Sequence, residues 1–477
     1  MLPKKIRLLY IIYWLCIFLG LLFFHFVNKM NADEGVVLNG AWNIINGRRL
    51  YLDFFSFIPP ASYYFVVAIW KIFGVSYLVA QAASIIVWFF GIFGIFKISQ
   101  EIYHTNNNYL LPLFLVLASS GYILINHNIY NIVCLIWSVY FLIIALKNKL
   151  KPVQQLEVEG SFWRNGFKRN YYLFCLVGLL NGLGFLFLQQ KSLVFYLAVN
   201  LFLVGFIFFK AGFKNFWKEI VVYNLSVFLP MLILFFWPLK LLFYNLIEFP
   251  LFQYLEVNRI SYFNLFFFSF IYLVFIWVFR KRKEIEIKIL LYLQLFLLIS
   301  AIPLPDIYHI FQIYFPIFAL TPLIFIEISE KKRFLKFFLN FLIIIFIFKI
   351  ITTAVITLAL DSSKASVRSK TWVELVSKNC PEKYIFVGPF FPNFYFETKK
   401  LNSTPFDILI TGHQTKEQFQ LALQSLKKSP PACAILIYPG SLGRFNYSKE
   451  NLVEAYISDN YNLVESSEDA FFLFRLK

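Results

Sequence analysis

The chain has 477 residues, of which 60% are hydrophobic, and it carries a formal net charge of +18. A soluble fold cannot hide this much apolar surface, so the composition excludes an ordinary soluble protein and predicts a polytopic α-helical membrane protein. The excess of positive charge does not indicate nucleic-acid binding, because much of it lies in basic runs at the ends of apolar segments, such as residues 280–283 and 331–333.

Apolar runs long enough to cross a bilayer, which takes about 20 helical residues, recur throughout residues 1–360. The shorter apolar run at residues 59–73 is interpreted as a re-entrant or surface-lying helix. We predict about eleven transmembrane helices, at residues 8–27, 76–98, 109–126, 128–146, 171–190, 192–210, 219–239, 263–280, 288–302, 310–328 and 336–359.

Basic residues orient these helices, because Lys and Arg in short loops are retained in the cytoplasm. With a cytoplasmic N-terminus, the inner segments hold 22 Lys and Arg and the outer loops hold 7. The prediction is a multi-pass protein of the inner or plasma membrane. Its first large loop, residues 28–75, and its C-terminal residues lie outside the cytoplasm, and its first span acts as an uncleaved signal anchor.

Three acidic residues lie in that first loop: the pair Asp33 and Glu34 directly after the first span, and Asp53. Charges beside the apolar body of a membrane protein cost free energy, so they are candidates for function. Neighbouring residues of a helix project about 100° apart. One carboxylate can therefore accept a proton as a general base, while the other holds the backbone or a metal. The competing interpretation is an acidic pair that complements a helix N-terminus.

Residues 361–477 have the pattern of a small α/β domain, and we expect it to be extracytoplasmic. Strands are predicted at residues 384–388, 434–438 and 470–475, and helices at residues 415–426 and 451–459. A disulfide between Cys380 and Cys433 is chemically permitted outside the cytoplasm, but the sequence leaves their pairing open. No nucleophile constellation is visible here, which favours a structural or acceptor-recognition role.

The first loop resembles membrane glycosyltransferases of the GT-C fold, in particular the group of protein mannosyltransferases and aminoarabinose transferases. The resemblance rests on Asp33-Glu34, on a pattern like Gly-x-x-x-Tyr-x-Asp-Phe at residues 47–54, and on a proline-led apolar helix from Pro59-Pro60 to Phe73-Gly74. Weaker similarities follow at residues 188–191 and at Tyr308-His309 with Pro316. The predicted fold is therefore a GT-C-like transmembrane region, residues 1–360, with the α/β domain at residues 361–477.

This resemblance implies an inverting glycosyltransferase that moves one sugar from a polyprenyl-phosphate donor to a lipid, glycan or protein acceptor at the outer membrane face. Asp33 would be the general base, Glu34 its structural partner and Asp53 a second acidic group near the cleft. No metal site is assigned. A divalent cation stays open as a cofactor, although residues 126–131 lack the further acidic residue of several members, which favours a metal-independent mechanism.

The donor phosphate needs cationic and polar partners in an apolar site. Lys191 is either such a ligand or a helix-end anchor whose ammonium reaches the membrane surface, and a surface role competes at the other positions as well. The candidates for substrate binding are Lys191, Gln190, Arg259, His309, Arg48, Arg49 and Tyr51.

Two other functions compete with the single-sugar transferase. A ligase or polymerase of lipid-linked glycans would share outer loops and phosphate-binding cations. A flippase or transporter of lipid-linked sugars would be expected to show inverted repeats and broken helices at the membrane midplane, and the sequence has no such repeat.

Overall fold

The computed structural model describes residues 4–26, 30, 32–103, 106–150, 162–206, 217–254, 262–302, 305–329, 348, 352, 365–438, 440–467 and 471–477. The chain divides into two compact units, each assembled from separate segments. Unit one comprises Met1–Val27, Gln81–Ile233 and Ile260–Ala359, and unit two comprises Asn28–Ala80, Leu234–Arg259 and Leu360–Lys477.

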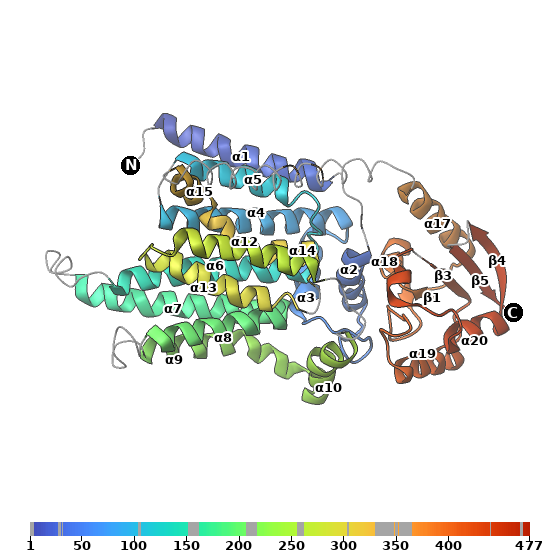
Figure 1. Ribbon diagram of the computed structural model, residues 1–477. Coiled ribbons are helices and arrows are strands. Elements are labelled where there is room, and N and C mark those ends of the chain that lie inside the picture. The colour runs from blue at the N-terminus through green and yellow to red at the C-terminus, as the bar shows by residue number, and fades with distance from the viewer. Residues whose placement is uncertain are drawn as a thin grey trace. The chain divides into compact units, whose positions relative to one another are not determined.

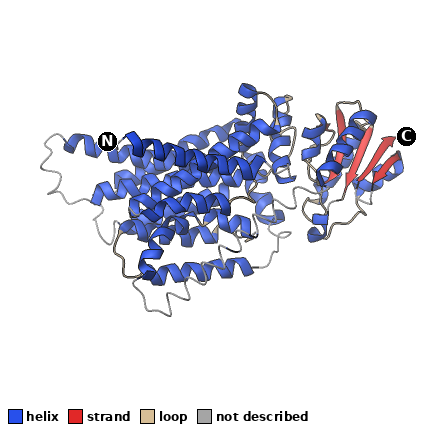
Figure 2. Cartoon of the chain, turned by 90° about the horizontal axis from the view of Figure 1, so that it is seen from above, coloured by secondary structure: helices blue, strands red, loops and turns tan. Residues whose placement is uncertain are grey.

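Unit one is a bundle of apolar helices that run side by side (Figures 1 and 2). Short 3-10 segments at Asn106–Tyr109 and Leu232–Phe236 flank two of them. The helices are α1 (Lys4–Phe26), α4 (Tyr77–Ile102), α5 (Leu110–Ala118), α6 (His127–Leu150), α7 (Phe162–Phe187), α8 (Gln189–Phe206), α9 (Trp217–Met231), α12 (Phe263–Phe279), α13 (Ile285–Ile299), α14 (Ile307–Ile313) and α15 (Phe315–Ser329).

Five stretches of the described helices are long and apolar enough to cross a membrane, which confirms the prediction of a multi-pass membrane protein. They are Arg7–Phe26, Tyr77–Ile102, His127–Lys149, Asn170–Phe187 and Trp217–Phe236. The predicted eleventh span, residues 336–359, lies outside the described residues apart from Phe348 and Thr352.

Two predicted spans differ in the structure, each at a residue that disfavours helix. The expected helix at residues 109–126 ends at Ala118, where Ser119, Ser120 and Gly121 follow. The expected helix at residues 310–328 is divided into α14 and α15 at Tyr314. Pro316 explains that break, because proline has no backbone N–H and crowds the preceding turn.

Glycines let α7 and α9 approach each other closely in unit one. A Cβ at Gly178 would lie 2.4 Å from the carbonyl oxygen of Tyr223, and a Cβ at Gly182 would lie 2.2 Å from that of Val227. Small residues at such positions favour backbone contact between membrane helices. This packing fixes α7, whose C-terminal end leads directly into α8.

Unit two joins the first loop to the C-terminal segment of the chain. The loop contributes α2 (Ala32–Ile45) and α3 (Ala61–Phe73). The predicted short helix at residues 59–73 is thus α3, which buries Val66, Val67 and Trp70 in this unit. The segment after α9 adds α10 (Leu239–Phe243) and two π-helical turns, η6 (Tyr244–Glu248) and η7 (Pro250–Tyr254).

The C-terminal segment forms a five-stranded sheet with helices on both faces, drawn in red and blue in Figure 2. The strand order is β2-β1-β3-β5-β4, with β1 parallel to β2 and β3, and β5 antiparallel to β3 and β4. The elements are α17 (Ala365–Asn379), β1 (Tyr384–Pro389), α18 (Asn393–Thr398), β2 (Leu401–Asn402), α19 (Lys416–Lys428), β3 (Cys433–Ile437), α20 (Leu452–Asn460), β4 (Tyr461–Ser467) and β5 (Phe471–Leu476).

Alternating side chains of the sheet enter two separate cores. Ile385 and Val387 of β1 pack with α17 and α18, whereas Phe386 packs with α19 and α20. Strands covered on both faces read as continuous apolar runs, which is why β1 and β3 were visible in the sequence. The three predicted strands and two predicted helices of this segment are confirmed, and the predicted set lacked α17, α18, β2 and β4.

A disulfide joins Cys380 to Cys433, with their Cα atoms 6.0 Å apart, and settles the pairing that the sequence left open. It links the end of α17 to the start of β3 within the apolar core. Because disulfides persist mainly in oxidising compartments, it is consistent with an extracytoplasmic C-terminal segment.

Candidate functional site

Lys191 lies in the first turn of α8 and is buried, with 2% of its surface exposed. Its ammonium donates to Asn128 Oδ1 at 2.7 Å and to Gln312 Oε1 at 3.4 Å, from α6 and α14. Within the described part of the chain, no carboxylate lies within ion-pair distance of its Nζ atom. A lysine is thus held in an apolar helix bundle by neutral amides.

Electrostatic interactions connect two histidines and an aspartate with this lysine in unit one. Asp306 caps α14 by accepting the backbone N–H of His309 at 2.8 Å, and its other oxygen accepts His309 Nδ1–H, also at 2.8 Å. His127 at the start of α6 lies within electrostatic range of both His309 and Lys191. The structure therefore brings the predicted candidates Lys191 and His309 into one polar cluster.

The acidic pair begins α2 in unit two, where carboxylates complement the positive end of the helix dipole. Asp33 is exposed, whereas Glu34 is 5% exposed and accepts a hydrogen bond from the Tyr77 hydroxyl at 3.1 Å. Adjacent positions on one helix turn thus give the two carboxylates different surroundings. Asp33 is exposed at the surface of its unit, whereas Glu34 is buried and hydrogen-bonded to Tyr77.

Asp53 is paired with Arg49 across one turn of the loop. Its carboxylate accepts the backbone N–H of Arg49 at 2.7 Å and the guanidinium at 3.0 Å and 3.1 Å. These hydrogen bonds hold the pKa of Asp53 below its ordinary value. The pair orders the loop between Gly47 and Phe54, whose Tyr51 has a left-handed backbone (φ 66°) and donates its hydroxyl to Ile58 O.

Arg48 joins the loop to the C-terminal segment. Its guanidinium donates to the carbonyl oxygens of Asp53, Asn402 and Thr404 and to the side chain of Asn43, over distances of 2.6–3.4 Å. Nearby, the amides of Asn402 and Asn43 donate to the carboxylate of Asp407 at 2.9 Å and 3.4 Å. Burial raises the pKa of Asp407, against the lowering effects of Asn402 and Arg48.

The remaining candidates contribute less. Gln190 is half-buried beside Lys191, and Arg259 lies outside the described residues. Among the residues that the structure describes, no group of three or more His, Cys, Asp or Glu side chains could hold a metal ion.

Two residues of these clusters were missed by sequence reasoning. Asp407 stands between Phe406 and Ile408, and a lone carboxylate flanked by apolar residues is a signal that could have identified it. Gln312 has the equivalent signal inside the apolar residues of α14. Gln312 is 121 residues from Lys191 and Asp407 is 364 residues from Asn43, so no local pattern predicts these contacts.

The helix bundle and the five-stranded sheet give this chain the GT-C fold, as the resemblance implied. No protein-family model matches the sequence, and no curated protein matches it. The likeness is one of structure, at 11–13% identity, and it establishes the fold.

Two solved proteins show this likeness over most of their length. ArnT from Cupriavidus metallidurans bound to undecaprenyl phosphate aligns with a TM-score of 0.64 and 11% identity, over 99% of this chain and 98% of ArnT. The oligosaccharyltransferase AglB from Archaeoglobus fulgidus, in complex with an inhibitory peptide and a dolichol-phosphate, aligns with a TM-score of 0.54 and 12% identity. That match covers 91% of this chain and 70% of AglB.

Proposed function

We propose that this protein is an inverting glycosyltransferase that moves a sugar from a polyprenyl-phosphate donor to an acceptor at the outer face of the membrane. The observation that carries the proposal is buried Lys191, whose hydrogen-bond partners Asn128 and Gln312 are neutral. The charge of Asp306 acts on this ammonium, but among the described residues no carboxylate pairs with it directly, and an anionic ligand would offset the remaining cost of desolvation. A lipid phosphate supplies such an anion from within the membrane.

The nature of the donor follows from the predicted orientation. Nucleotide sugars are cytoplasmic, so a transferase that acts outside needs a sugar on a lipid carrier. The asymmetry of basic residues and the Cys380–Cys433 disulfide both support an outer position for the C-terminal segment. ArnT and AglB, which share the fold, were solved with a polyprenyl or dolichol phosphate.

In the proposed reaction, Asp33 takes the proton of an acceptor hydroxyl or amine, whose oxygen or nitrogen attacks the anomeric carbon. The bond between that carbon and the phosphate oxygen breaks, and the polyprenyl phosphate leaves with the electron pair. Attack from the opposite side inverts the anomeric configuration. Glu34, held by Tyr77, positions the helix turn that carries Asp33.

The hydrogen-bond partners of the remaining candidate residues separate those assigned to the phosphate from those assigned to the structure of the first loop. His309, oriented by Asp306, is assigned to the phosphate with Lys191 and Gln190. Arg48, Arg49, Asp53 and Tyr51 are assigned to the order of the first loop, because their side chains already bond within it or to the C-terminal segment. A role for Arg259 rests on the sequence alone.

The test separates donor binding from chemistry in two variants of the full chain. Lys191→Met should weaken binding of undecaprenyl phosphate in nanodiscs by about tenfold or more, because one charge-assisted contact is lost. Asp33→Asn should keep that binding and lower transfer of sugar to envelope glycans by about 100-fold or more. Lys240→Met on exposed α10 is the control. Unchanged lipid binding in Lys191→Met, or an unchanged glycan profile in Asp33→Asn, would contradict the proposal.

A further inference from the structure

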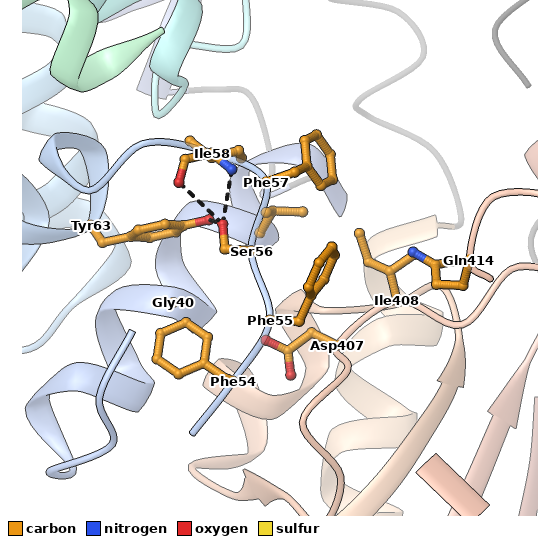
Figure 3. A pocket seen from close by; sticks show the side chains of 11 residues that line it. Gly40, Phe54, Phe55, Ser56, Phe57, Ile58, Tyr63, Asp407, Ile408 and Gln414 are labelled. Carbon is orange, nitrogen blue, oxygen red and sulfur yellow. Dashed lines mark hydrogen bonds between the residues drawn. The ribbon is translucent and has the colours of Figure 1, made fainter. Parts of the chain in front are cut away.

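A shallow hollow, partly open to solvent and with enclosed room for about one water molecule, lies within unit two (Figure 3). The first loop contributes Phe54, Phe55, Phe57 and Tyr63 to its lining, and the C-terminal segment contributes Asp407 and Gln414. Neither Lys191 nor Asp33 lines it. The residues that line the hollow are therefore different from those assigned to the donor phosphate and to the general base.

The aromatic walls of the hollow are fixed by contacts behind them. Phe55 packs edge-on against Phe249 at 4.8 Å between ring centroids, and Phe57 lies 5.7 Å from the same ring. The Tyr63 and Ser56 hydroxyls are 2.7 Å apart, and Ser56 Oγ also accepts the backbone N–H of Ile58. Figure 3 shows this hydrogen-bonded corner beside the phenylalanine rings. These rings would lose little freedom on binding a ligand.

The polar groups at the hollow are a carboxylate and a carboxamide. Asp407 accepts hydrogen bonds from the side chains of Asn402, Asn43 and Asn39, whereas a carboxylate can accept about four. Gln414 is 5% exposed, and its Oε1 accepts the backbone N–H of Ile410 at 2.8 Å, which orients its NH₂ group. The hollow thus combines flat apolar rings with directed acceptors and donors.

We propose that this hollow binds the edge of a sugar ring of a hydroxyl-rich glycan. Phenylalanine faces suit the C–H face of a pyranose, the Asp407 carboxylate accepts from its hydroxyls, and the Gln414 amide donates to them. A cationic ligand suits the hollow less well, because the positive charge of Arg48 already acts on Asp407. On the proposed glycosyltransferase function, this glycan is the acceptor, and the hollow holds it at a sugar other than the one that reacts.

The test is saturation-transfer difference NMR on the full chain in nanodiscs. The probes are the methyl glycosides of glucose, galactose, mannose and N-acetylglucosamine, with n-butylamine as the cationic probe. At least one glycoside should receive saturation from the wild-type protein. That signal should be lost in Asp407→Asn, which removes the charged acceptor, and in Phe57→Leu, which removes a ring face. Asp459→Asn, exposed on α20, is the matched control and should retain it.

Phe57→Leu keeps the test decisive if Asp407→Asn fails to fold, because Phe57 takes no part in the Arg48 network. The proposal is overturned by a glycoside signal that survives in Phe57→Leu, by no signal from any glycoside, or by a signal from butylamine alone. Lys191→Met and Asp33→Asn should retain the glycoside signal. If the wild-type protein gives a glycoside signal but does not bind lipid phosphate, the transferase is refuted and this glycan site stands. If it binds lipid phosphate but gives no glycoside signal, the glycan site is refuted and the transferase stands.

Discussion

Lys191 and Arg48 carry the same charge and were predicted to share one task, yet their partners differ in kind. The lysine is buried against two neutral amide oxygens. The arginine donates to three backbone carbonyls and a side-chain amide in unit two. A cation that already donates to four acceptors within the protein stabilises structure, whereas a buried cation with few neutral partners is suited to bind an anion. This contrast decides which residue we assign to the phosphate.

Arg48→Ala is expected to destabilise the protein by about 2 kcal/mol, because three carbonyl oxygens lose their guanidinium donor. Arg49→Ala should have a much smaller effect, since its ion pair with Asp53 is exposed. The measurement is chemical unfolding of the purified chain in detergent, followed by tryptophan fluorescence. Equal effects of the two substitutions would show that the Arg48 contacts do not hold the loop.

At the scale of elements, α2 is the helix that carries the acidic pair and packs on the C-terminal segment. Gly35 lies against α18, since a Cβ there would come within 2.5 Å of the backbone nitrogen of Asn393. Further along α2, Gly40 lies against the Tyr63 ring. The Trp42 indole, about two turns after Gly35, donates to Lys400 O at 2.8 Å. The packing of α18 therefore sets the position of the turn that contains Asp33 and Glu34.

Gly35→Ala should cost about 1–3 kcal/mol of stability, because the added methyl group meets backbone atoms that cannot rotate away. It should also lower sugar transfer while binding of undecaprenyl phosphate is unchanged. Gly205→Ala on α8 is the matched control, since a Cβ at that position meets no atom within 4 Å. Thermal unfolding and the glycan profile are the two readouts. A Gly35→Ala protein as stable and active as the control would refute the role of this contact.

At the scale of the whole molecule, orientation in the membrane decides which chemistry is available. The basic residues predict that the loop after α12 is cytoplasmic and that the C-terminal segment is outside. Glu417→Cys, on exposed α19, should therefore react with a membrane-impermeant maleimide in intact cells. Lys283→Cys, exposed between α12 and α13, should react only after permeabilisation. The opposite pattern would reverse the orientation and remove the need for a lipid-linked donor.

Local sequence pattern is enough to predict the membrane-protein class, the short helix after Pro59-Pro60, and three strands and two helices of the C-terminal segment. Each of these follows from local composition. A helix that crosses a lipid bilayer must be long and apolar, and a strand that is buried on both faces of its sheet must be apolar throughout. The acidic pair and Lys191 were also visible, because charges are rare in such a chain.

The contacts of each polar residue, in contrast, depend on how the chain folds in three dimensions. Asn128, Lys191 and Gln312 meet across 184 residues of chain, and Arg48 finds Asn402 and Thr404 more than 350 residues away. The tertiary structure also decides that Cys380 and Cys433 pair and that residues 32–80 pack with the C-terminal segment. Hydrogen bonds and close packing act over a few ångströms in space, so their partners are fixed by the fold and not by neighbourhood in the sequence.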